Sequence, residues 1–337
     1  MRSRKTFITL LVACLVLFSG TAWSTAGSLP ESSTTRIQFA LGATSGVVSG
    51  NLPAHSSAHY VLRAGAGQLL EVTLSAPEGA VLKVTSLWGW TLTPVQGTSG
   101  PTGFRGYLPY TGDYFLSVSS GSQAAAYSVN VVIPVRIRFE PNATSATLTG
   151  HLNAYQRLDY ILRAGQGQVL EINAQPEMAG SDSNPLQLVI YGVDGTVLRS
   201  GMGEGSSFRG LLPLSQDYRV SLRAGGTPTN FTMSVIIPQR ISFQTGAISA
   251  SVHNPSLPAG QAQYYSLRAM QGQTMQVQVR PGTNLQLIIY GMDGTVLKSG
   301  MGEGASFSGV LPTTQDYILA VRAGSDPASY TLHVTIY

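Results

Sequence analysis

Cysteine is almost absent from this sequence, because Cys14 is the only one among 337 residues. No disulfide forms within such a chain, so a folded structure depends on the burial of apolar side chains. Cys14 lies in an amino-terminal segment that we interpret below as a leader. A cysteine nucleophile is therefore excluded from the rest of the chain.

Charged residues are also scarce, at 11% of the sequence against 43% hydrophobic residues. This balance argues against intrinsic disorder, which requires low hydrophobicity and high net charge. Of the 20 basic residues, Arg2, Arg4 and Lys5 belong to the leader, which leaves 17 basic against 16 acidic residues. The remaining chain is nearly neutral and has no basic run, so we expect no binding to nucleic acid.

Long hydrophobic runs are missing beyond the amino terminus. The single run, Thr6–Phe18, follows the basic segment Met1–Lys5 and precedes small residues near Ala22–Ala26. This pattern is typical of a secretory signal peptide, which we place at residues 1–26. The run is shorter than the roughly 20 residues of a membrane-spanning helix. We therefore predict a secreted, periplasmic or cell-surface protein with no transmembrane segment after the leader.

A lipoprotein is the alternative reading of the same segment. Leu11–Cys14 resembles a bacterial lipobox, in which the cysteine becomes a lipidated first residue. Against this reading, Leu15–Phe18 continues the apolar run where a lipoprotein normally turns polar. A protein processed at Cys14 would be anchored to a membrane.

The segment Tyr160–Gln168 recurs in two further versions, Tyr60–Gln68 and Tyr265–Gln273. Each version begins as an alternating strand and ends in a Gly-Gln turn. The repeats that contain them begin at Arg36, Arg136 and Arg240. Spacings of 100 and 104 residues are typical of tandem domains and too long for solenoid units.

Three tandem domains are therefore predicted after the leader. They span residues 34–134, 135–238 and 239–337. Pro134 and Pro238 stand at the two junctions, and proline restricts the chain locally. We expect a semi-rigid array.

Strand signals are dense within the second repeat. They cover residues 146–152, 159–164, 169–174, 186–191, 196–199, 207–212, 218–223 and 231–237. A loop rich in proline, glycine and polar residues is expected at Pro176–Pro185, and Asp194-Gly195 predicts a tight hairpin. No stretch has helical periodicity. The sequence thus predicts an all-β chain of three antiparallel, jelly-roll-like β-sandwiches.

The first repeat differs from the others at one block. Tyr191–Gly205 and Tyr290–Gly304 are nearly identical, whereas the first repeat has Leu87–Thr91 there, with Trp88 and Trp90 and no Asp-Gly turn. Two tryptophans spaced by two are expected on one face of a strand. Packing in the core or at a domain junction is the favoured reading. An exposed pair would instead stack on sugar rings or bind a partner, because tryptophan is enriched at binding hot spots.

The other residues that could bind a ligand or act in catalysis are expected to have structural roles. The arginines that precede alanine in each Tyr-x-Leu-Arg-Ala strand are expected to face solvent. They are Arg63, Arg163 and Arg268. The aspartates before a strand tyrosine are expected to bond their own backbone in a turn. They are Asp113, Asp217 and Asp316.

Glu204 and Glu303 are expected in hairpin loops. The histidines show no spacing typical of a zinc site. They are His55, His59, His151, His253 and His333. We predict no catalytic constellation, no cofactor and no metal site.

The order of these signals resembles the bacterial pre-peptidase C-terminal (PPC) domain and the related sandwich of g-type lysozyme inhibitors. Those families show Gly-x-Leu, Tyr-x-Leu, a Gly-Gln turn, Asp-Gly and Gly-Asp-Tyr in this order. The matching residues of the second repeat are Gly150, Leu152, Tyr160, Leu162, Gly167, Gln168, Asp194, Gly195, Asp217 and Tyr218. The resemblance implies exported, non-catalytic modules. Related sandwiches bind calcium through an acidic cluster before the tyrosine, where this chain has only Asp159.

We therefore expect a non-enzymatic array for cell-surface binding, adhesion or envelope structure. Its partner would be a protein or a cell-envelope glycan, and self-association is left open. The alternative function is inhibition of a partner enzyme such as a lysozyme. An enzyme with a site that the sequence does not reveal is the third hypothesis.

Overall fold

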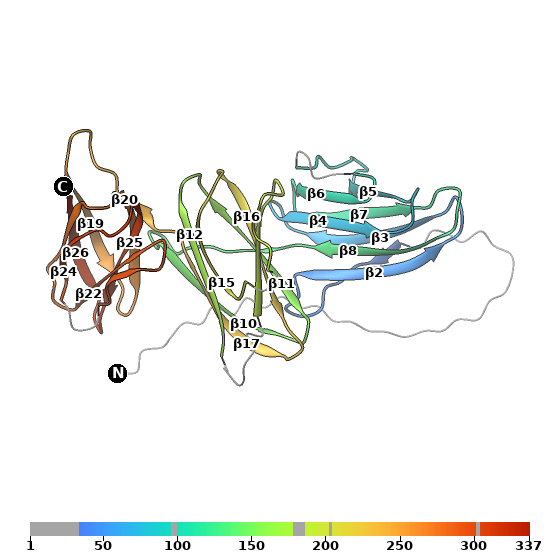
Figure 1. Cartoon of the computed structure of the whole chain (residues 1–337). Helices are drawn as coiled ribbons and strands as arrows, with labels where there is room; N and C mark the ends of the chain where they lie inside the picture. The colour runs from blue at the N-terminus through green and yellow to red at the C-terminus, as the bar shows by residue number, and fades with distance from the viewer. Residues whose placement is uncertain (1–33, 96–99, 178–185, 202–203, 301–303) are drawn as a thin grey trace.

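The computed structural model describes residues 34–95, 100–177, 186–201, 204–300 and 304–337. The predicted leader, including Cys14, lies outside these residues. All regular elements of the described part are β-strands, which confirms the all-β prediction. No helix among the described residues is long and apolar enough to cross a membrane. The strands form three sandwiches that follow one another in a row (Figure 1).

The first sandwich has two four-stranded sheets, with strand orders β1-β3-β7-β5 and β2-β8-β4-β6. Its strands are β1 (Thr34–Arg36), β2 (Ser45–Leu52), β3 (Ser57–Ala64), β4 (Leu69–Ser75), β5 (Val81–Ser86), β6 (Gly103–Tyr107), β7 (Gly112–Ser119) and β8 (Ala125–Val132). The pairs are antiparallel except that β1 runs parallel to β3.

The second sandwich repeats this arrangement with one added edge strand. Its sheets have the orders β9-β11-β16-β13-β14 and β10-β17-β12-β15. The strands are β9 (Val135–Arg136), β10 (Ser145–Leu152), β11 (Arg157–Ala164), β12 (Val169–Pro176), β13 (Leu186–Gly192), β14 (Val197–Arg199), β15 (Ser207–Leu211), β16 (Gln216–Ala224) and β17 (Thr229–Ile236). Each predicted strand of this repeat is present, with ends shifted by at most two residues.

The third sandwich has the sheets β18-β20-β25-β22-β23 and β19-β26-β21-β24. Its strands are β18 (Gln239–Arg240), β19 (Ser249–Leu257), β20 (Ala262–Ala269), β21 (Thr274–Arg280), β22 (Leu285–Gly291), β23 (Val296–Lys298), β24 (Ser306–Val310), β25 (Gln315–Ala323) and β26 (Ala328–Ile336). Most of the loop predicted at Pro176–Pro185, from residue 178 to 185, lies outside the described residues. Glu303 also lies outside them.

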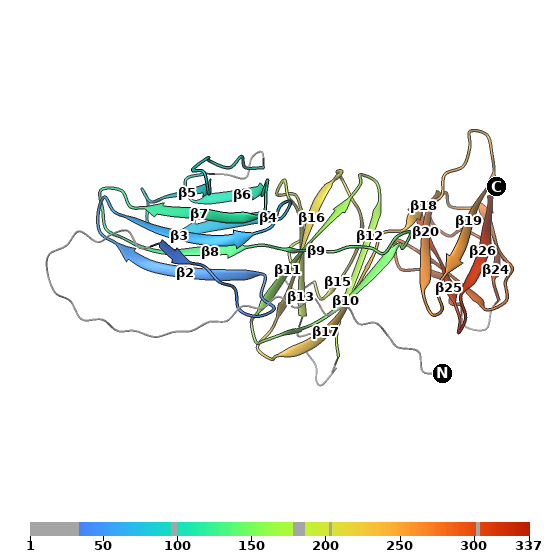
Figure 2. The ribbon, with the colours of Figure 1, turned by 180° about the vertical axis from the view of Figure 1, so that it is seen from behind.

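Each sandwich has its own apolar core between its two sheets. Alternation puts Leu70, Val72 and Leu74 of β4 into the first core, while Glu71 lies on the opposite, outward side of the same strand. The outward side of this sheet is therefore free to contact the next sandwich. Figure 2 shows from behind that the first and second sandwiches lie side by side at this place.

The repeated motifs have local structural roles. The glutamine of each Gly-Gln turn accepts a hydrogen bond through Oε1 from the backbone N–H three residues earlier. These donors are Gly65 at 2.6 Å, Gly165 at 2.5 Å and Met270 at 2.7 Å. The glycine before each glutamine has φ between 73° and 84°, a region that favours glycine. The motif therefore specifies a turn and not a ligand site.

Candidate functional site

The block in which the first repeat differs from the others forms an exposed turn. Strand β5 ends at Ser86, whose side-chain oxygen accepts a hydrogen bond from the Trp90 N–H at 3.2 Å. Gly89 has a φ of 78°, and its N–H donates to the Ser86 carbonyl at 2.9 Å. Trp88 and Trp90 therefore lie in a turn. The expectation that they share one face of a strand is wrong. The expected burial is also wrong, because 59% of Trp88 and 70% of Trp90 is exposed.

Four aromatic rings continue from this turn into the core. The Trp88 ring lies 5.7 Å from the Trp90 ring and 4.6 Å from the Tyr110 ring, centroid to centroid. Tyr110 stacks on Tyr114 at 5.1 Å, and Tyr114 is fully buried. These spacings are within the range of favourable aromatic pairs. We call Trp90, Trp88 and Tyr110, anchored on Tyr114, the aromatic ladder.

The ladder occupies the place that a polar turn takes in the other sandwiches. In the second sandwich the Gln216 Oε1 accepts from the Asp194 N–H at 3.2 Å, and in the third Gln315 does the same for Asp293 at 2.9 Å. The first sandwich has Gly112 in place of this glutamine. A Cβ at Gly112 would lie 3.3 Å from two atoms of the Tyr110 ring. The missing side chain thus makes room for the ring on which Trp88 packs.

A tyrosine hydroxyl holds the base of the ladder in position. The Tyr114 Oη donates to the Tyr110 carbonyl at 2.6 Å. The same bond joins Tyr218 to Leu214 and Tyr317 to Thr313, each at 2.6 Å. The support of the ladder is thus common to all three sandwiches, whereas the two exposed tryptophans belong to the first.

Two junctions join the sandwiches, and both use the same faces. We call the outward side that bears Thr44, Glu71 and Arg105 the exit face of the first sandwich. We call the outward side that bears Asp159, Arg219 and Ser221 the entry face of the second. The same names apply to the equivalent positions of the other repeats, which the strand registers align.

The first junction contains a buried network of charged side chains. Arg219 contacts Glu71 across the junction, and its Nη2 donates to Asp159 Oδ1 at 2.8 Å. Burial lowers the pKa of the Arg219 guanidinium to about 10, which leaves it protonated at neutral pH. Thr44 accepts from the Asp159 N–H at 2.8 Å, so the two sandwiches also share a backbone contact.

Apolar contacts accompany these charges. Leu69 of the first sandwich packs with Ile161 and Val193 of the second, and all three are buried. Arg105 Nη1 donates to the Val193 carbonyl at 3.0 Å. The junction thus has an apolar cluster beside its ion pairs.

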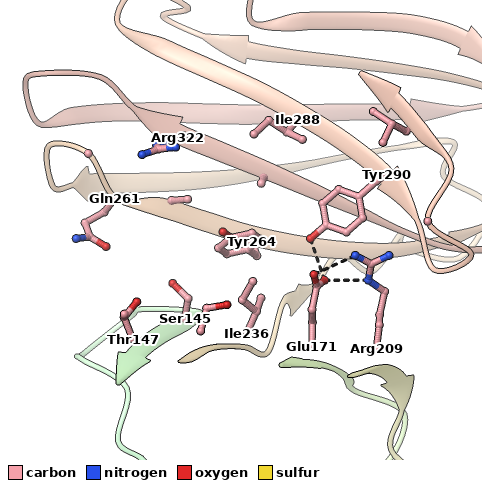
Figure 3. Close-up of a pocket in the computed structure, with 16 residues that line it drawn as sticks. Ser145, Thr147, Glu171, Arg209, Ile236, Gln261, Tyr264, Ile288, Tyr290 and Arg322 are labelled. Atoms are coloured by element: carbon pink, nitrogen blue, oxygen red, sulfur yellow. Dashed lines mark hydrogen bonds and ion pairs between the residues drawn. The ribbon is translucent and has the colours of Figure 1, made fainter. Parts of the chain in front are cut away.

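The second junction keeps the backbone contacts but has fewer charges. Thr144 accepts from the Tyr264 N–H at 2.7 Å, and Arg209 donates to the Gly291 carbonyl at 3.4 Å. Glu171 pairs with Arg209 at 3.0 Å and accepts from the Tyr290 hydroxyl at 3.1 Å (Figure 3). Ile318 stands where the second sandwich has Arg219, so the contact between Arg219 and Glu71 has no equivalent at this position.

A crevice of about 530 Å³ lies beside the second junction (Figure 3). Its walls include Ser145 and Thr147 on one side and Gln261, Tyr264 and Arg322 on the other. A crevice of about 620 Å³ lies at the equivalent place of the first junction. Its lining contains the equivalent residues Ser45, Gln156 and Arg223. The recurrence follows from the repeated docking geometry, so neither crevice indicates a ligand by itself.

The strand arginines face solvent, as predicted, since Arg63, Arg163 and Arg268 are exposed. The aspartates before the tyrosines have structural roles, but the expected bond to their own backbone is wrong. Each pairs with the arginine that opens its repeat. The pairs are Arg36–Asp113 at 2.9 Å, Arg136–Asp217 at 2.7 Å and Arg240–Asp316 at 2.6 Å.

Other predicted residues are dispersed. Glu204 accepts from the Gly201 N–H at 3.2 Å, in a turn. Among the described residues, no group of three or more histidine, cysteine, aspartate or glutamate side chains lies close enough to hold a metal ion. Asp159, which we considered only as the remainder of a calcium site, is instead fully buried and paired with arginines.

The junction network was not predicted from the sequence. The signal was the departure of one repeat from the others at paired positions. The second repeat has Asp159 and Arg219, where the third has Tyr264 and Ile318. Charges that appear together in one copy of a repeat indicate a contact made by that copy alone.

No protein-family model and no curated protein matches this chain. Among solved structures, it is similar to the periplasmic g-type lysozyme inhibitors PliG of Aeromonas hydrophila and of Salmonella Typhimurium. The first is 22% identical, covers 30% of this chain and 96% of that chain, and gives a TM-score of 0.27. The second is 16% identical, covers 29% of this chain and 96% of that chain, and gives a TM-score of 0.24.

A triple jelly-roll protein of an archaeal virus is also similar, at 10% identity and a TM-score of 0.19. The match covers 87% of this chain and 90% of that chain. At these identities and scores, none of the three similarities carries an argument about function. The resemblance to pre-peptidase domains stays a prediction.

Proposed function

We propose that this chain is an exported, non-enzymatic binding array, and that its first sandwich binds a cell-envelope glycan through the aromatic ladder. The observation that carries the proposal is the exposure of Trp88 and Trp90 on a fixed support. Large exposed aromatic side chains are costly in water and are enriched where proteins bind partners.

The geometry of the ladder suits a sugar ring. A pyranose presents C–H groups on its faces, and these pack on the electron-rich face of an indole. Because Trp88 packs on Tyr110 and Tyr110 on Tyr114, the ladder is held before a ligand arrives. A preorganised surface loses little conformational entropy on binding.

The test is co-sedimentation of the chain from residue 27 onward with insoluble cell-envelope polysaccharide, including peptidoglycan. We expect the wild-type chain to sediment with at least one such polysaccharide. Trp88→Ala and Trp90→Ala should each weaken retention about tenfold or more, as expected for a tryptophan hot spot. Tyr155→Ala is the matched control, because Tyr155 is an exposed aromatic residue of the second sandwich.

Two outcomes would contradict the proposal. One is retention that neither tryptophan variant changes, and the other is no retention on any envelope polysaccharide. A separate assay tests the alternative function suggested by the lysozyme-inhibitor resemblance. Inhibition of a g-type lysozyme that persists in both tryptophan variants would favour a protein partner bound elsewhere.

A further inference from the structure

The exit face occurs in three copies, and two of them are covered. The equivalent threonines Thr44 and Thr144 are 4% and 7% exposed because the next sandwich packs on them. The third sandwich has Ile248 at this position, and 58% of it is exposed. An isoleucine here is the opposite of the polar substitution expected on a face that meets only water.

Further apolar side chains lie on the same exit face. Val310, at the end of β24, is 66% exposed, and Tyr337, beside β21, is 56% exposed. The Tyr337 carbonyl accepts from the Thr274 N–H at 2.8 Å, which fixes Tyr337 at the edge of this sheet. The third exit face is thus an uncovered apolar surface formed by Ile248, Val310 and Tyr337.

The charges of the other exit faces are missing from this one. The pair Glu71 and Arg105 and the pair Glu171 and Arg209 face each other across their sheets. At the same register the third sandwich has Gln276 opposite Ser308. A partner that meets this face therefore needs no buried counter-charge.

The first sandwich offers an entry face of matching character. Its positions equivalent to Asp159, Arg219 and Ser221 are His59, Phe115 and Ser117. These three are half-buried in the first sandwich, whereas Asp159, Arg219 and Ser221 are buried by the preceding sandwich. The arginine that pairs with Glu71 is thus replaced by an aromatic ring.

The residues that replace Glu71 and Arg219 on the two uncovered faces correspond to each other. In the first junction, Glu71 forms an ion pair with Arg219. The equivalent positions on the two uncovered faces are Gln276 and Phe115. Both members of the ion pair are absent from the faces that would meet if the junction geometry were repeated between chains. Neither face would therefore hold one member of this pair without the other. Lys83 lies opposite Ser117 on the edge strand β5 of the same entry face, and it is exposed.

We propose that the exit face of the third sandwich docks on the entry face of the first sandwich of a second copy of this chain. Such a head-to-tail contact is heterologous, so it produces a ring if the rotation closes and a filament if it does not. In the repeated geometry the turn of Leu87 and Trp88 lies beside this contact, as the turn of Val193 and Asp194 does in the first junction, so association is measured without glycan and with variants outside the aromatic ladder.

The first test is the solution mass of the chain from residue 27 onward, measured by light scattering over a range of concentrations without glycan. We expect the mass to rise with concentration beyond that of one chain. Ile248→Glu should weaken association about tenfold or more, because it buries an unpaired charge. Leu214→Glu is the control, since Leu214 is an exposed leucine of the second sandwich, whose two faces are already covered.

The second test rebuilds the internal ion pair between chains. Gln276→Glu and Phe115→Arg should each weaken association, and the double variant should recover most of it. A chain that stays monomeric at all concentrations would overturn the proposal. So would an assembly that Ile248→Glu leaves unchanged, or a double variant that associates no better than the single ones. Unchanged circular dichroism and thermal unfolding would show that the variants fold.

Discussion

Asp217 connects three parts of the chain through one carboxylate. Its oxygens accept from Arg136 of β9 at 2.7 and 3.1 Å and from the Tyr107 hydroxyl of the first sandwich at 2.5 Å. Burial alone would raise the pKa of this carboxyl, but the hydrogen bonds from Arg136 and Tyr107 outweigh it and lower the pKa. Asp217 therefore links β9 and the first sandwich to β16.

The lowered pKa of Asp217 predicts a loss of stability in acid. A carboxyl whose pKa is lower in the folded state contributes stability above its unfolded value of 3.8, and this contribution is lost as the pH falls through the lowered pKa. We expect Asp217→Asn to cost about 1.5 kcal/mol at neutral pH, as for a hydrogen bond to a charged group. Chemical unfolding at several pH values measures this, and the difference from wild type should shrink below about pH 4.

Asp113→Asn is the matched control for this prediction. The Arg36–Asp113 pair is more exposed, and the Arg36 hydrogen bond lowers the pKa of Asp113 without a contact to another sandwich. Its loss should have a smaller effect. A difference between Asp217→Asn and wild type that stays constant from pH 7 to pH 3 would contradict the assigned role.

The sequence predicted these aspartates as structural but not their partners. A turn aspartate that bonds its own backbone requires only local sequence, and so it was the natural expectation. The observed partner, Arg136, is 81 residues away, and the two meet only because β9 runs beside β11. Contacts made across a sheet edge depend on strand order, which alternation alone does not determine.

At the scale of elements, the strands followed directly from the sequence. A period of two distinguishes an inward from an outward side, and it located each strand of the second repeat. The Trp88 turn did not follow, because the same period placed both tryptophans on a strand. Gly89 and the absent glutamine at Gly112 were the signals for a turn, and their meaning depends on the Tyr110 ring beside them.

The tyrosine at the third position of β7, β16 and β25 makes the same hydrogen bond to the preceding turn in each sandwich. Tyr218→Phe removes the hydroxyl that donates to the Leu214 carbonyl and accepts from the Leu214 N–H at 3.3 Å. We expect a loss of about 1 kcal/mol, the usual net contribution of such a bond. Differential scanning calorimetry should show a melting transition lowered by about 4 °C or more.

Tyr160→Phe serves as a comparison, since no hydrogen bond of the Tyr160 hydroxyl is part of this turn. An equal effect of both variants would show that the turn bond is not what stabilises the sandwich. An unchanged transition for Tyr218→Phe would contradict the prediction directly.

At the scale of the whole molecule, the two junctions join equivalent faces through different side chains. The first uses Asp159, Arg219 and Ser221 on the entry face, and the second uses Tyr264, Ile318 and Ala320 at the same registers. Buried ion pairs are often replaceable by well-packed apolar residues, whereas the removal of one partner is costly. The second junction therefore shows which uncharged residues can replace the charged network of the first junction.

Arg219→Ile alone should destabilise the first junction by about 3 kcal/mol, because Asp159 and Glu71 lose a shared guanidinium. The triple variant Asp159→Tyr, Arg219→Ile, Ser221→Ala reproduces the second junction and should recover most of this loss. Calorimetry of the whole chain, with small-angle scattering for the relation of the sandwiches, checks both. A triple variant as unstable as the single one would contradict this account of the junction.

The docking of the sandwiches could be predicted only in part. Pro134 indicated a restricted junction, but not which faces meet. That choice depends on outward side chains such as Glu71 and Arg219, which sequence periodicity classes simply as solvent-facing. The comparison of repeats at equivalent positions is what distinguishes a junction residue from a surface residue.

The central claim is that the aromatic ladder of the first sandwich binds a glycan, and tryptophan emission tests it most directly. The sequence has three tryptophans, and Trp23 lies in the predicted leader, so in the chain from residue 27 onward only Trp88 and Trp90 emit. Titration with soluble fragments of envelope polysaccharide should shift this emission to shorter wavelengths and saturate, because a bound sugar ring excludes water from the indoles. Emission that stays unchanged while the same polysaccharide retains the protein would contradict the claim.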